Sequence, residues 1–270
     1  MFLHSEYIAP RGWKPKNPDE DYLITELDIE LADDVPQDKF EEVAASCAAE
    51  SSTGTWTKVD EGKHSGTKLA KKLRAVAYDL DPETKTFKIA YKKEIFELGN
   101  MAGIFAGIAG NIDSMKMIKA FRLLDVRFPK SLVQSFPGPQ FGIEGVRDFM
   151  QIERGPLLCT VPKPKIGRTA KEQAYLARIL FTAANGEFQG IKDDENLTSL
   201  YFNKFEDRCR LVHEVQRDVE KKSGKRKMYL CNVTHSDIDV MLDRADMIKE
   251  NEGRWMMMDV IVTGFAAVQT

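Results

Sequence analysis

The stretch FQGIKDDEN, residues 188–196, decides the fold class of the second half of the chain. Its apolar and small residues are typical of a short buried strand, and a lysine and three acidic residues follow at once. Helical patterns flank it at 169–184 and 205–222, and Thr169 with Glu172 predicts a capping box at the start of the first helix. A strand between two such helices predicts parallel βαβ units.

The same alternation continues on both sides of this stretch. The predicted strands span 156–162, 188–194, 227–234 and 255–263, with a third helix at 236–250. A closed TIM (β/α)8 barrel needs eight strands and about 250 residues. The sequence therefore predicts the first half of such a barrel, with residues 264–270 beginning a further helix, and we expect a chain that stops partway round it. A smaller open α/β domain is the alternative.

The first half of the chain has a different pattern. Strands are predicted at 22–31, 53–60, 73–81, 86–93 and 121–129, and helices at 36–49 and 98–110. This order predicts an α+β (ferredoxin-like) domain with its helices on one face of the sheet. The Gly/Pro-rich stretch 136–145 is the predicted boundary. We place the α+β domain at 1–137 and the partial barrel at 138–270.

Composition and charge narrow the class of protein. The chain has 43% hydrophobic and 30% charged residues and a net charge of -3, which gives no electrostatic footprint for nucleic acid or an anionic membrane. Its four cysteines form no CxxC pair and are typical of reduced, buried residues. The N-terminus lacks the apolar core of a signal peptide, and no apolar run approaches the ~18 residues of a membrane span. We expect a cytoplasmic protein that binds neither nucleic acid nor membranes.

The charged end of the strand at 188–194 is the strongest candidate site. On a strand, Lys192 and Asp194 face one side and Asp193 faces the other. The carboxyl ends of parallel strands are where α/β proteins build their sites, and Asp194 and Glu195 are oxygen ligands suited to Mg²⁺. Reaction of Lys192 with CO₂ would give a carbamate and so a third anionic ligand. The alternative is a simple Lys–Asp/Glu ion pair before a helix.

Three further stretches carry candidate site residues. In VPKPKIG (161–167), Lys163 and Lys165 share a face at a strand end, which would suit a phosphorylated or enolic substrate. In ESSTGTW (50–56), a Ser/Thr/Gly turn after Glu50 has the composition of a phosphate-binding loop. Asn111 follows the small-residue helix at 98–110. The alternatives are two solvated lysines and an ordinary turn, and Asn111 alone indicates little.

Taken in order, four motifs resemble the large subunit of ribulose-1,5-bisphosphate carboxylase/oxygenase (Rubisco). They are ESSTGTW, GN followed by MK within 110–116, KPKIG at 163–167 and KDDEN at 192–196. The resemblance extends from about Glu20 to the end of the chain. VPKPK and GPQFGIEGVR (138–147) are similar to the archaeal-type, form III, enzymes, whereas photosynthetic forms typically read TIKPK.

The resemblance implies a role for each candidate residue of the second half. Lys192 would be carbamylated by CO₂, would hold Mg²⁺ with Asp194 and Glu195, and would remove the C3 proton of the substrate. Lys163 would contact the enediolate and protonate the final carbanion. Lys165 would support that site.

The candidates of the first half would serve a neighbouring subunit. The resemblance implies that Glu50, Thr55, Trp56 and Asn111 enter the site of the partner subunit in a homodimer or an oligomer of dimers. Thr55 and Trp56 would hold a phosphate, and Asn111 would touch metal or substrate.

The implied reaction turns ribulose 1,5-bisphosphate, CO₂ and water into two 3-phosphoglycerates, with O₂ as the other gas. In the archaeal group its usual role is salvage of ribose that derives from nucleosides or from AMP. The family's later histidines, mobile lysine loop and glycine-rich phosphate site would follow the fourth barrel strand. We therefore expect residues 1–270 alone to lack carboxylase activity.

Three other interpretations remain. A Rubisco-like enolase or isomerase of methionine salvage has the same fold, but such proteins usually replace several catalytic positions, and every position that can be checked here matches the carboxylase pattern. A non-catalytic half-barrel partner protein would have no need of metal ligands. An unrelated α/β domain would have to carry four ordered motifs by chance.

Overall fold

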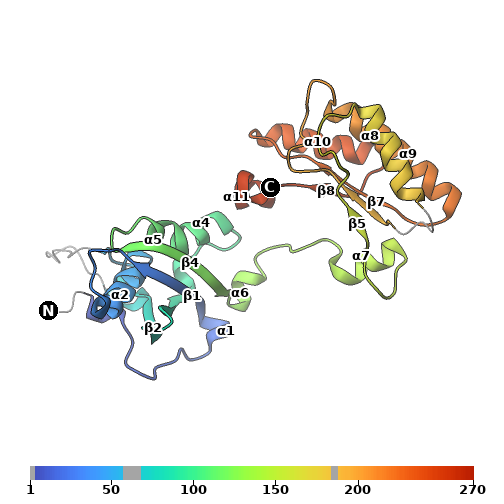
Figure 1. Ribbon diagram of the computed structural model, residues 1–270. Coiled ribbons are helices and arrows are strands. Elements are labelled where there is room, and N and C mark those ends of the chain that lie inside the picture. Colours follow the sequence, from blue (N-terminus) through green and yellow to red (C-terminus); the bar gives the residue numbers. More distant parts are fainter. Residues whose placement is uncertain (1–3, 57–67, 184–187) are drawn as a thin grey trace. The chain divides into compact units, whose positions relative to one another are not determined.

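The structure is a computed structural model that describes residues 4–56, 68–183 and 188–270 (Figure 1). The chain divides into two compact units, Met1–Gly138 and Pro139–Thr270. Within the described ranges, no helix is both long enough and apolar enough to span a membrane.

The first unit is built on a four-stranded antiparallel sheet in the order β2-β3-β1-β4. Its strands are β1 (Tyr22–Leu31), β2 (Val76–Asp81), β3 (Thr86–Lys92) and β4 (Ile118–Arg127). Helices separate β1 from β2 and β3 from β4 in the chain. This βαββαβ order with β1 and β3 in the centre is the ferredoxin-like arrangement, so the predicted α+β class is confirmed.

Two helical segments supply the core of the first unit. Helix α2 (Phe40–Glu50) is buried along most of its length. The second segment runs through α4 (Met101–Phe105), the π-helical turn η4 (Ala106–Gly110) and α5 (Asn111–Asp113). Its buried residues Ile104, Ile108 and Ile112 recur every four positions and join the same cluster as the apolar side chains of α2 and the sheet. The predicted helix at 98–110 therefore begins at Met101 and extends three residues further.

Short helices complete this unit. They are η1 (Ser5–Tyr7), α1 (Pro18–Asp21), η2 (Gln37–Lys39), α3 (Lys68–Leu73), η3 (Lys93–Ile95) and α6 (Lys130–Val133). The predicted strand at 53–60 is wrong over 53–56, where the chain turns at the end of α2 and the Gly54 N–H donates to the Ala49 carbonyl at 3.0 Å. The remainder of that prediction lies outside the described residues.

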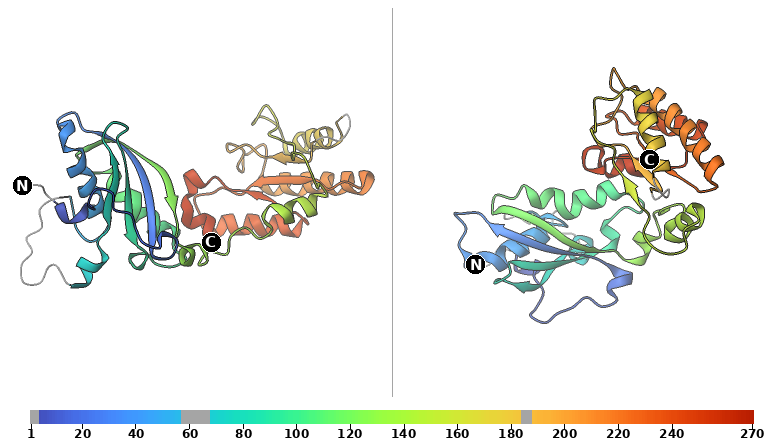
Figure 2. Two further views of the ribbon diagram at one scale, coloured as in Figure 1. Left: turned by 90° about the horizontal axis from the view of Figure 1, so that it is seen from below. Right: turned by 45° about the vertical axis from the view of Figure 1, so that its right-hand side comes forward.

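The second unit contains a parallel sheet in the order β5-β6-β7-β8. Its strands are β5 (Cys159–Thr160), β6 (Gly190–Lys192), β7 (Met228–Asn232) and β8 (Met256–Met257). Helices α8 (Ala170–Thr182), α9 (Phe205–Ser223) and α10 (Ile238–Glu250) connect them in turn (Figure 2). Each strand pairs with its neighbour in the sequence, as in a (β/α)8 barrel and unlike a doubly wound sheet, so the predicted half-barrel class is confirmed.

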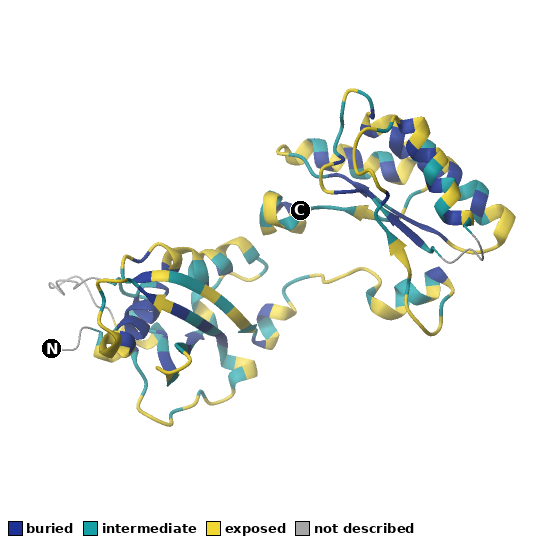
Figure 3. Cartoon of the chain, in the orientation of Figure 1, coloured by how far each residue is buried: buried dark blue, intermediate teal, exposed yellow. Residues whose placement is uncertain are grey.

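Burial follows this layering (Figure 3). The buried faces of α8 and α9 meet β6 and β7 around Phe181, Ile191, Phe205 and Tyr229, each at most 1% exposed. The predicted capping box is present at the start of α8: the Thr169 N–H donates to Glu172 Oε2 at 2.8 Å and the Glu172 N–H to Thr169 Oγ1 at 3.3 Å. This box fixes where the loop after β5 ends.

Two elements of the second unit differ from prediction. The strand expected at 255–263 ends at Met257, because the Asp259 carboxylate accepts the Ile261 N–H at 3.1 Å and opens helix α11 (Val260–Gln269). Helix α7 (Gly142–Met150) was not predicted, and it begins within the Gly/Pro-rich stretch that marks the predicted domain boundary. Both differences have a local cause. A single capping residue, Asp259, begins a helix inside an apolar run, and α7 begins inside a Gly/Pro-rich stretch, so the longer pattern gives no sign of either helix start.

Candidate functional site

The loop that follows β6 carries the acidic cluster. Lys192 is the last residue of β6, and its Nζ lies 2.5 Å from Glu195 Oε1 and 3.0 Å from the Asp193 carbonyl oxygen. The hydrogen bond from Lys192 holds the pKa of Glu195 below its usual range. The Lys–Glu ion pair that was the alternative interpretation of this stretch is therefore present when Lys192 is an unmodified amine.

Asp193 faces the interior, as strand alternation predicted. Its side chain is fully buried and accepts hydrogen bonds from Arg208 Nε at 3.0 Å and from the Tyr229 hydroxyl, 3.0 Å from each carboxylate oxygen. The Asn232 N–H adds a further bond at 3.2 Å. A buried carboxylate with a paired guanidinium and two more donors is a fixed anchor, because leaving its charge unpaired would be costly.

Asn232, the last residue of β7, holds the same loop from the neighbouring strand. Its side-chain amide donates to the Asp194 carbonyl at 3.3 Å and to the Glu195 carbonyl at 3.1 Å. Its Oδ1 accepts the Thr234 N–H at 3.0 Å. Sequence reasoning missed Asn232, Arg208 and Tyr229, although a buried polar residue at the end of the adjacent apolar strand was a usable signal for Asn232.

Both predicted lysines, Lys163 and Lys165, lie close to the carboxylate of Asp194. Lys163 Nζ lies 2.7 Å from its Oδ2, and Lys165 Nζ lies 3.9 Å from its Oδ1 and 2.7 Å from Asn196 Oδ1. Burial raises the pKa of Asp194, but the hydrogen bonds from Lys163 and the Asn196 N–H, with the charges of both lysines, outweigh it and lower the pKa overall. The structure thus brings all five candidates of the second unit together at the carboxyl ends of β5 and β6.

The oxygen donors present fit a divalent cation. Across the described ranges, no three His, Cys, Asp or Glu side chains gather as a metal site, and the loop after β6 offers two carboxylates, those of Asp194 and Glu195. One or two carboxylates with water molecules are a ligand set that Mg²⁺ accepts, so this pair fits the ion. A carbamate on Lys192, whose Nζ lies 2.5 Å from Glu195 Oε1, would add a third anionic oxygen.

In the first unit the turn after α2 is organised by one carboxylate. Glu50 Oε2 accepts the Thr55 hydroxyl at 2.7 Å and the Trp56 N–H at 2.9 Å. Trp56 is half-buried against the core of this unit. Asn111 is exposed at the start of α5, and among the described residues no hydrogen bond joins it to this turn.

Comparison with known proteins gives a consistent result. Residues 14–132 match the family model of the ribulose bisphosphate carboxylase large chain, N-terminal domain, and residues 142–270 match that of its catalytic domain. The ribulose bisphosphate carboxylase of Methanosarcina acetivorans is 38% identical over 268 residues, which are 99% of this chain and 60% of that protein. That of Methanocaldococcus jannaschii is 42% identical over 240 residues, 86% of this chain and 55% of that protein.

Solved structures agree in fold. The octameric Rubisco of Pyrococcus horikoshii superposes with a TM-score of 0.84 at 36% identity, over 97% of this chain and 59% of that one. The dimeric Rubisco of Hyperthermus butylicus gives 0.85 at 34% identity, over 97% and 59%. The chain thus spans about three fifths of the length of these relatives, and within that span it belongs to the ribulose bisphosphate carboxylase large-chain family.

Proposed function

We propose that this protein is a ribulose-bisphosphate carboxylase, converting ribulose 1,5-bisphosphate, CO₂ and water into two 3-phosphoglycerates, with O₂ as a competing gas. The observation that carries the proposal is the clustering around Asp194. Its buried carboxylate is shared by Lys163 and Lys165, and the Lys192–Glu195 pair is on the same loop. The family relationship points to the same reaction.

Activation requires a change at Lys192. Its deprotonated Nζ attacks the carbon of CO₂, an N–C bond forms, one proton leaves to solvent, and the side chain becomes an anionic carbamate. Lys192, Asp194 and Glu195 would then hold Mg²⁺. The metal would supply Lewis-acid stabilisation of negative charge on the substrate oxygens.

The remaining roles follow from the contacts between the loops that follow β5 and β6. An oxygen of the Lys192 carbamate takes the C3 proton of the sugar bisphosphate, which gives the enediol. Lys163, held toward the site by Asp194 at 2.7 Å, contacts the enediolate and returns a proton to the carbanion formed after C–C cleavage. Lys165, held by Asn196 at 2.7 Å, adds positive charge beside it.

Under this proposal, the candidate residues of the first unit complete the active site of a partner subunit. We assign residues 1–137 and 138–270 to separate domains, with the turn at Glu50, Thr55 and Trp56 binding a substrate phosphate of the partner chain. The two hydrogen bonds to Glu50 Oε2 preorganise that turn. Asn111 would contact metal or substrate.

The dimeric and octameric relatives support a dimer or an oligomer of dimers. Salvage of nucleoside-derived ribose in the cytoplasm is the physiological role we propose.

The test is isotope-labelled CO₂ incorporation by the natural gene product. We expect label in 3-phosphoglycerate, and a carbamate that can be trapped on Lys192 after incubation with CO₂ and Mg²⁺. The Lys192→Met variant should lose both, whereas Lys171→Met, a control on the exposed face of α8, should keep both.

Two outcomes would contradict the proposal. Enolisation or isomerisation of a sulfur-containing sugar phosphate without label incorporation would indicate a methionine-salvage enzyme. Full carboxylation by Lys192→Met would remove Lys192 from the mechanism.

A further inference from the structure

The loop after β5 carries Lys163 and Lys165, so the path of its backbone decides where their amines lie. Arg168 closes this loop on itself. Its Nη2 donates to the Pro162 carbonyl at 3.4 Å, and its Nε donates to Gln173 Oε1 at 3.0 Å. Gln173 is buried in α8. The segment that contains both lysines is therefore attached at its end to a fixed helix.

A buried asparagine holds the backbone at the end of the same loop. Asn203 is 1% exposed, and its Nδ2 donates to the Arg168 carbonyl at 2.9 Å. Two hydrogen bonds with Leu200 fix the backbone of Asn203 itself. The Asn203 N–H donates to the Leu200 carbonyl at 2.9 Å, and the Leu200 N–H donates to the Asn203 carbonyl at 3.1 Å. The side-chain amide therefore projects from a closed turn in a fixed direction.

The oxygen of this amide contacts the buried anchor of the loop after β6. Asn203 Oδ1 accepts from Arg208 Nη1 at 3.2 Å. Arg208 Nε donates to Asp193 Oδ2 at 3.0 Å, and its Nη2 donates to the Leu197 carbonyl at 3.3 Å. The Arg208 and Asp193 side chains are both fully buried. A satisfied network of this kind is rigid, because each partner would be costly to leave unpaired.

A continuous chain of hydrogen bonds thus joins the Arg168 carbonyl to the Asp193 carboxylate, with Asn203 in its middle. We propose that Asn203 is a positioning residue that fixes the loop bearing the two lysines relative to the loop bearing the two carboxylates. It acts through Arg168 and Arg208, not by contact with a substrate. Its effect on catalysis rests on the proposed carboxylase function, whereas its effect on the loop does not.

The two lysines cannot hold the loops together by themselves. The Lys163 and Lys165 side chains are 63% and 49% exposed, and exposed ion pairs contribute little to stability. Their contacts are nevertheless short, with Lys163 Nζ 2.7 Å from Asp194 and Lys165 Nζ 2.7 Å from Asn196. A displacement of about 1 Å between reacting groups can lower a rate about 100-fold. The buried amide of Asn203 is therefore the contact that sets the spacing.

The first measurement reports on the loop and does not need catalysis. A nitroxide label is attached at Ile166→Cys in a Cys159→Ser background, because Cys159 is exposed and the other three cysteines are buried. Asn203→Asp keeps the size of the side chain and an acceptor for Arg208, but removes the donor to the Arg168 carbonyl. We expect the electron paramagnetic resonance spectrum to shift toward the mobile component.

The second measurement is carboxylation kinetics of the natural gene product without the label. We expect Asn203→Asp to lower kcat about tenfold or more and to change KM by less than about threefold, because misplaced lysines would weaken contacts made in the transition state. A residue that only supports folding would lower the amount of folded enzyme and leave the label spectrum and the KM of the folded fraction unchanged.

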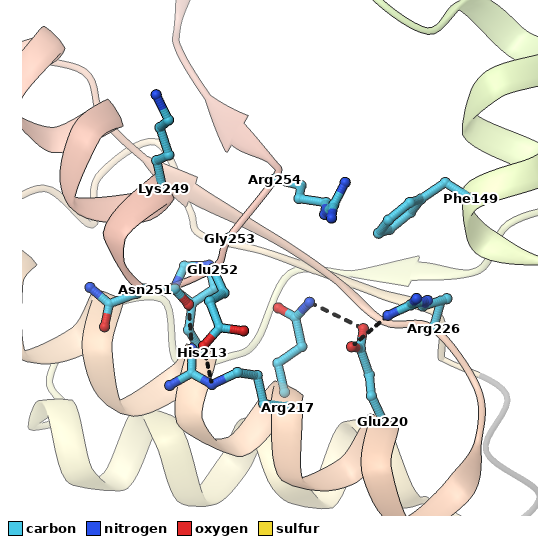
Figure 4. Close-up of a pocket in the computed structure, with 11 residues that line it drawn as sticks. Phe149, His213, Arg217, Glu220, Arg226, Lys249, Asn251, Glu252, Gly253 and Arg254 are labelled. Atoms are coloured by element: carbon cyan, nitrogen blue, oxygen red, sulfur yellow. Dashed lines mark hydrogen bonds and ion pairs between the residues drawn. The ribbon is translucent and has the colours of Figure 1, made fainter.

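The control is Asn251→Asp, which makes the same chemical change elsewhere in the second unit. The Asn251 amide donates to the Met247 carbonyl at 2.8 Å. Asn251 lines a cavity of about 400 Å³, together with Arg226 and Arg254, which stand two residues before β7 and β8 begin (Figure 4). This cavity is therefore at the amino-terminal ends of these strands, away from both loops. The control should leave label mobility, kcat and KM unchanged.

Each other outcome contradicts a stated part of the proposal. Unchanged label mobility in Asn203→Asp would show that Asn203 does not hold the loop, and a mobile label with unchanged kcat would remove it from catalysis. Equal effects of Asn251→Asp would make the response unspecific. If Asn203→Asp does not fold, Asn203→Ala, which adds no charge, carries the same measurements. A mobile label in Asn203→Asp without carboxylation by the unmodified protein would contradict the proposed function and leave the loop contact standing.

Discussion

Lys163 and Asp194 form an ion pair of 2.7 Å in which the lysine side chain is 63% exposed and the carboxylate only 8%. The buried partner is fixed by the loop after β6, whereas the exposed partner has room to move. An amine held in this way can exchange its carboxylate for a substrate oxygen without unfolding the loop. The pair therefore positions Lys163 while keeping it available.

Removing Lys163 should shift the titration of Asp194. The pKa of Asp194 is lowered despite burial, so its ionised form adds stability above its ordinary pKa of 3.8, and that stability is lost as the pH falls through the lower folded-state value. In Lys163→Met, burial is opposed by fewer charges, and the pKa should move upward. The carboxyl carbon shift of Asp194, followed by NMR, measures it. An unchanged pKa would mean that Lys163 does not hold this carboxylate in solution.

Arg208→Met should strongly destabilise the second unit. The variant leaves the fully buried carboxylate of Asp193 without its guanidinium, and breaking such a pair costs about 3–5 kcal/mol of unfolding free energy. Arg210→Met, the control on the same helix, breaks only exposed pairs with Glu214 and Asp207, each worth about 0–1 kcal/mol. Urea unfolding followed through Trp255, which lies in the second unit, compares the two. Similar losses in both variants would contradict the anchor role of Asp193.

Asn232→Ala should loosen the loop that follows β6. It removes the amide that donates to the Asp194 and Glu195 carbonyls, and leaving buried groups unsatisfied costs about 1–3 kcal/mol. We expect weaker Mn²⁺ binding, measured by electron paramagnetic resonance after incubation with bicarbonate. Asn251→Ala, which loses one amide bond to Met247 away from this loop, is the matched control. Stability loss with unchanged Mn²⁺ affinity would make Asn232 a structural residue only.

Thr169→Ala should shorten α8 at its start. The side chain caps the helix and takes part in the reciprocal box with Glu172, and loss of such a cap costs about 0.5–2 kcal/mol. Thr182→Ala removes a hydroxyl that only bonds back to Arg178 in the last turn, so it should be nearly neutral. Hydrogen exchange of the first turn of α8 distinguishes them. Equal protection in both variants would show that the box does not hold this end.

Prediction from sequence succeeded where a pattern is long. The alternation of apolar strands and amphipathic helices after residue 156 indicated the order β5-β6-β7-β8, and the charges at 192–195 marked the strand end that carries the site. Prediction failed where a few residues determine the end of a strand or the path of a turn. Asp259 caps a helix inside an apolar run and ends β8 early, and the turn after Glu50 follows a single carboxylate.

The sequence by itself determined the fold class, the family and the candidate residues Lys163, Lys165, Lys192, Asp194 and Glu195, because hydrophobic period and residue type are local properties. Only the tertiary structure decided which side chains hold them. The Arg208–Asp193 pair is 15 residues apart in the chain, and Asn232 bonds carbonyls 37 and 38 residues away. Such partners meet only after the parallel strands have paired, because folding, and not local pattern, brings the ends of β6 and β7 together.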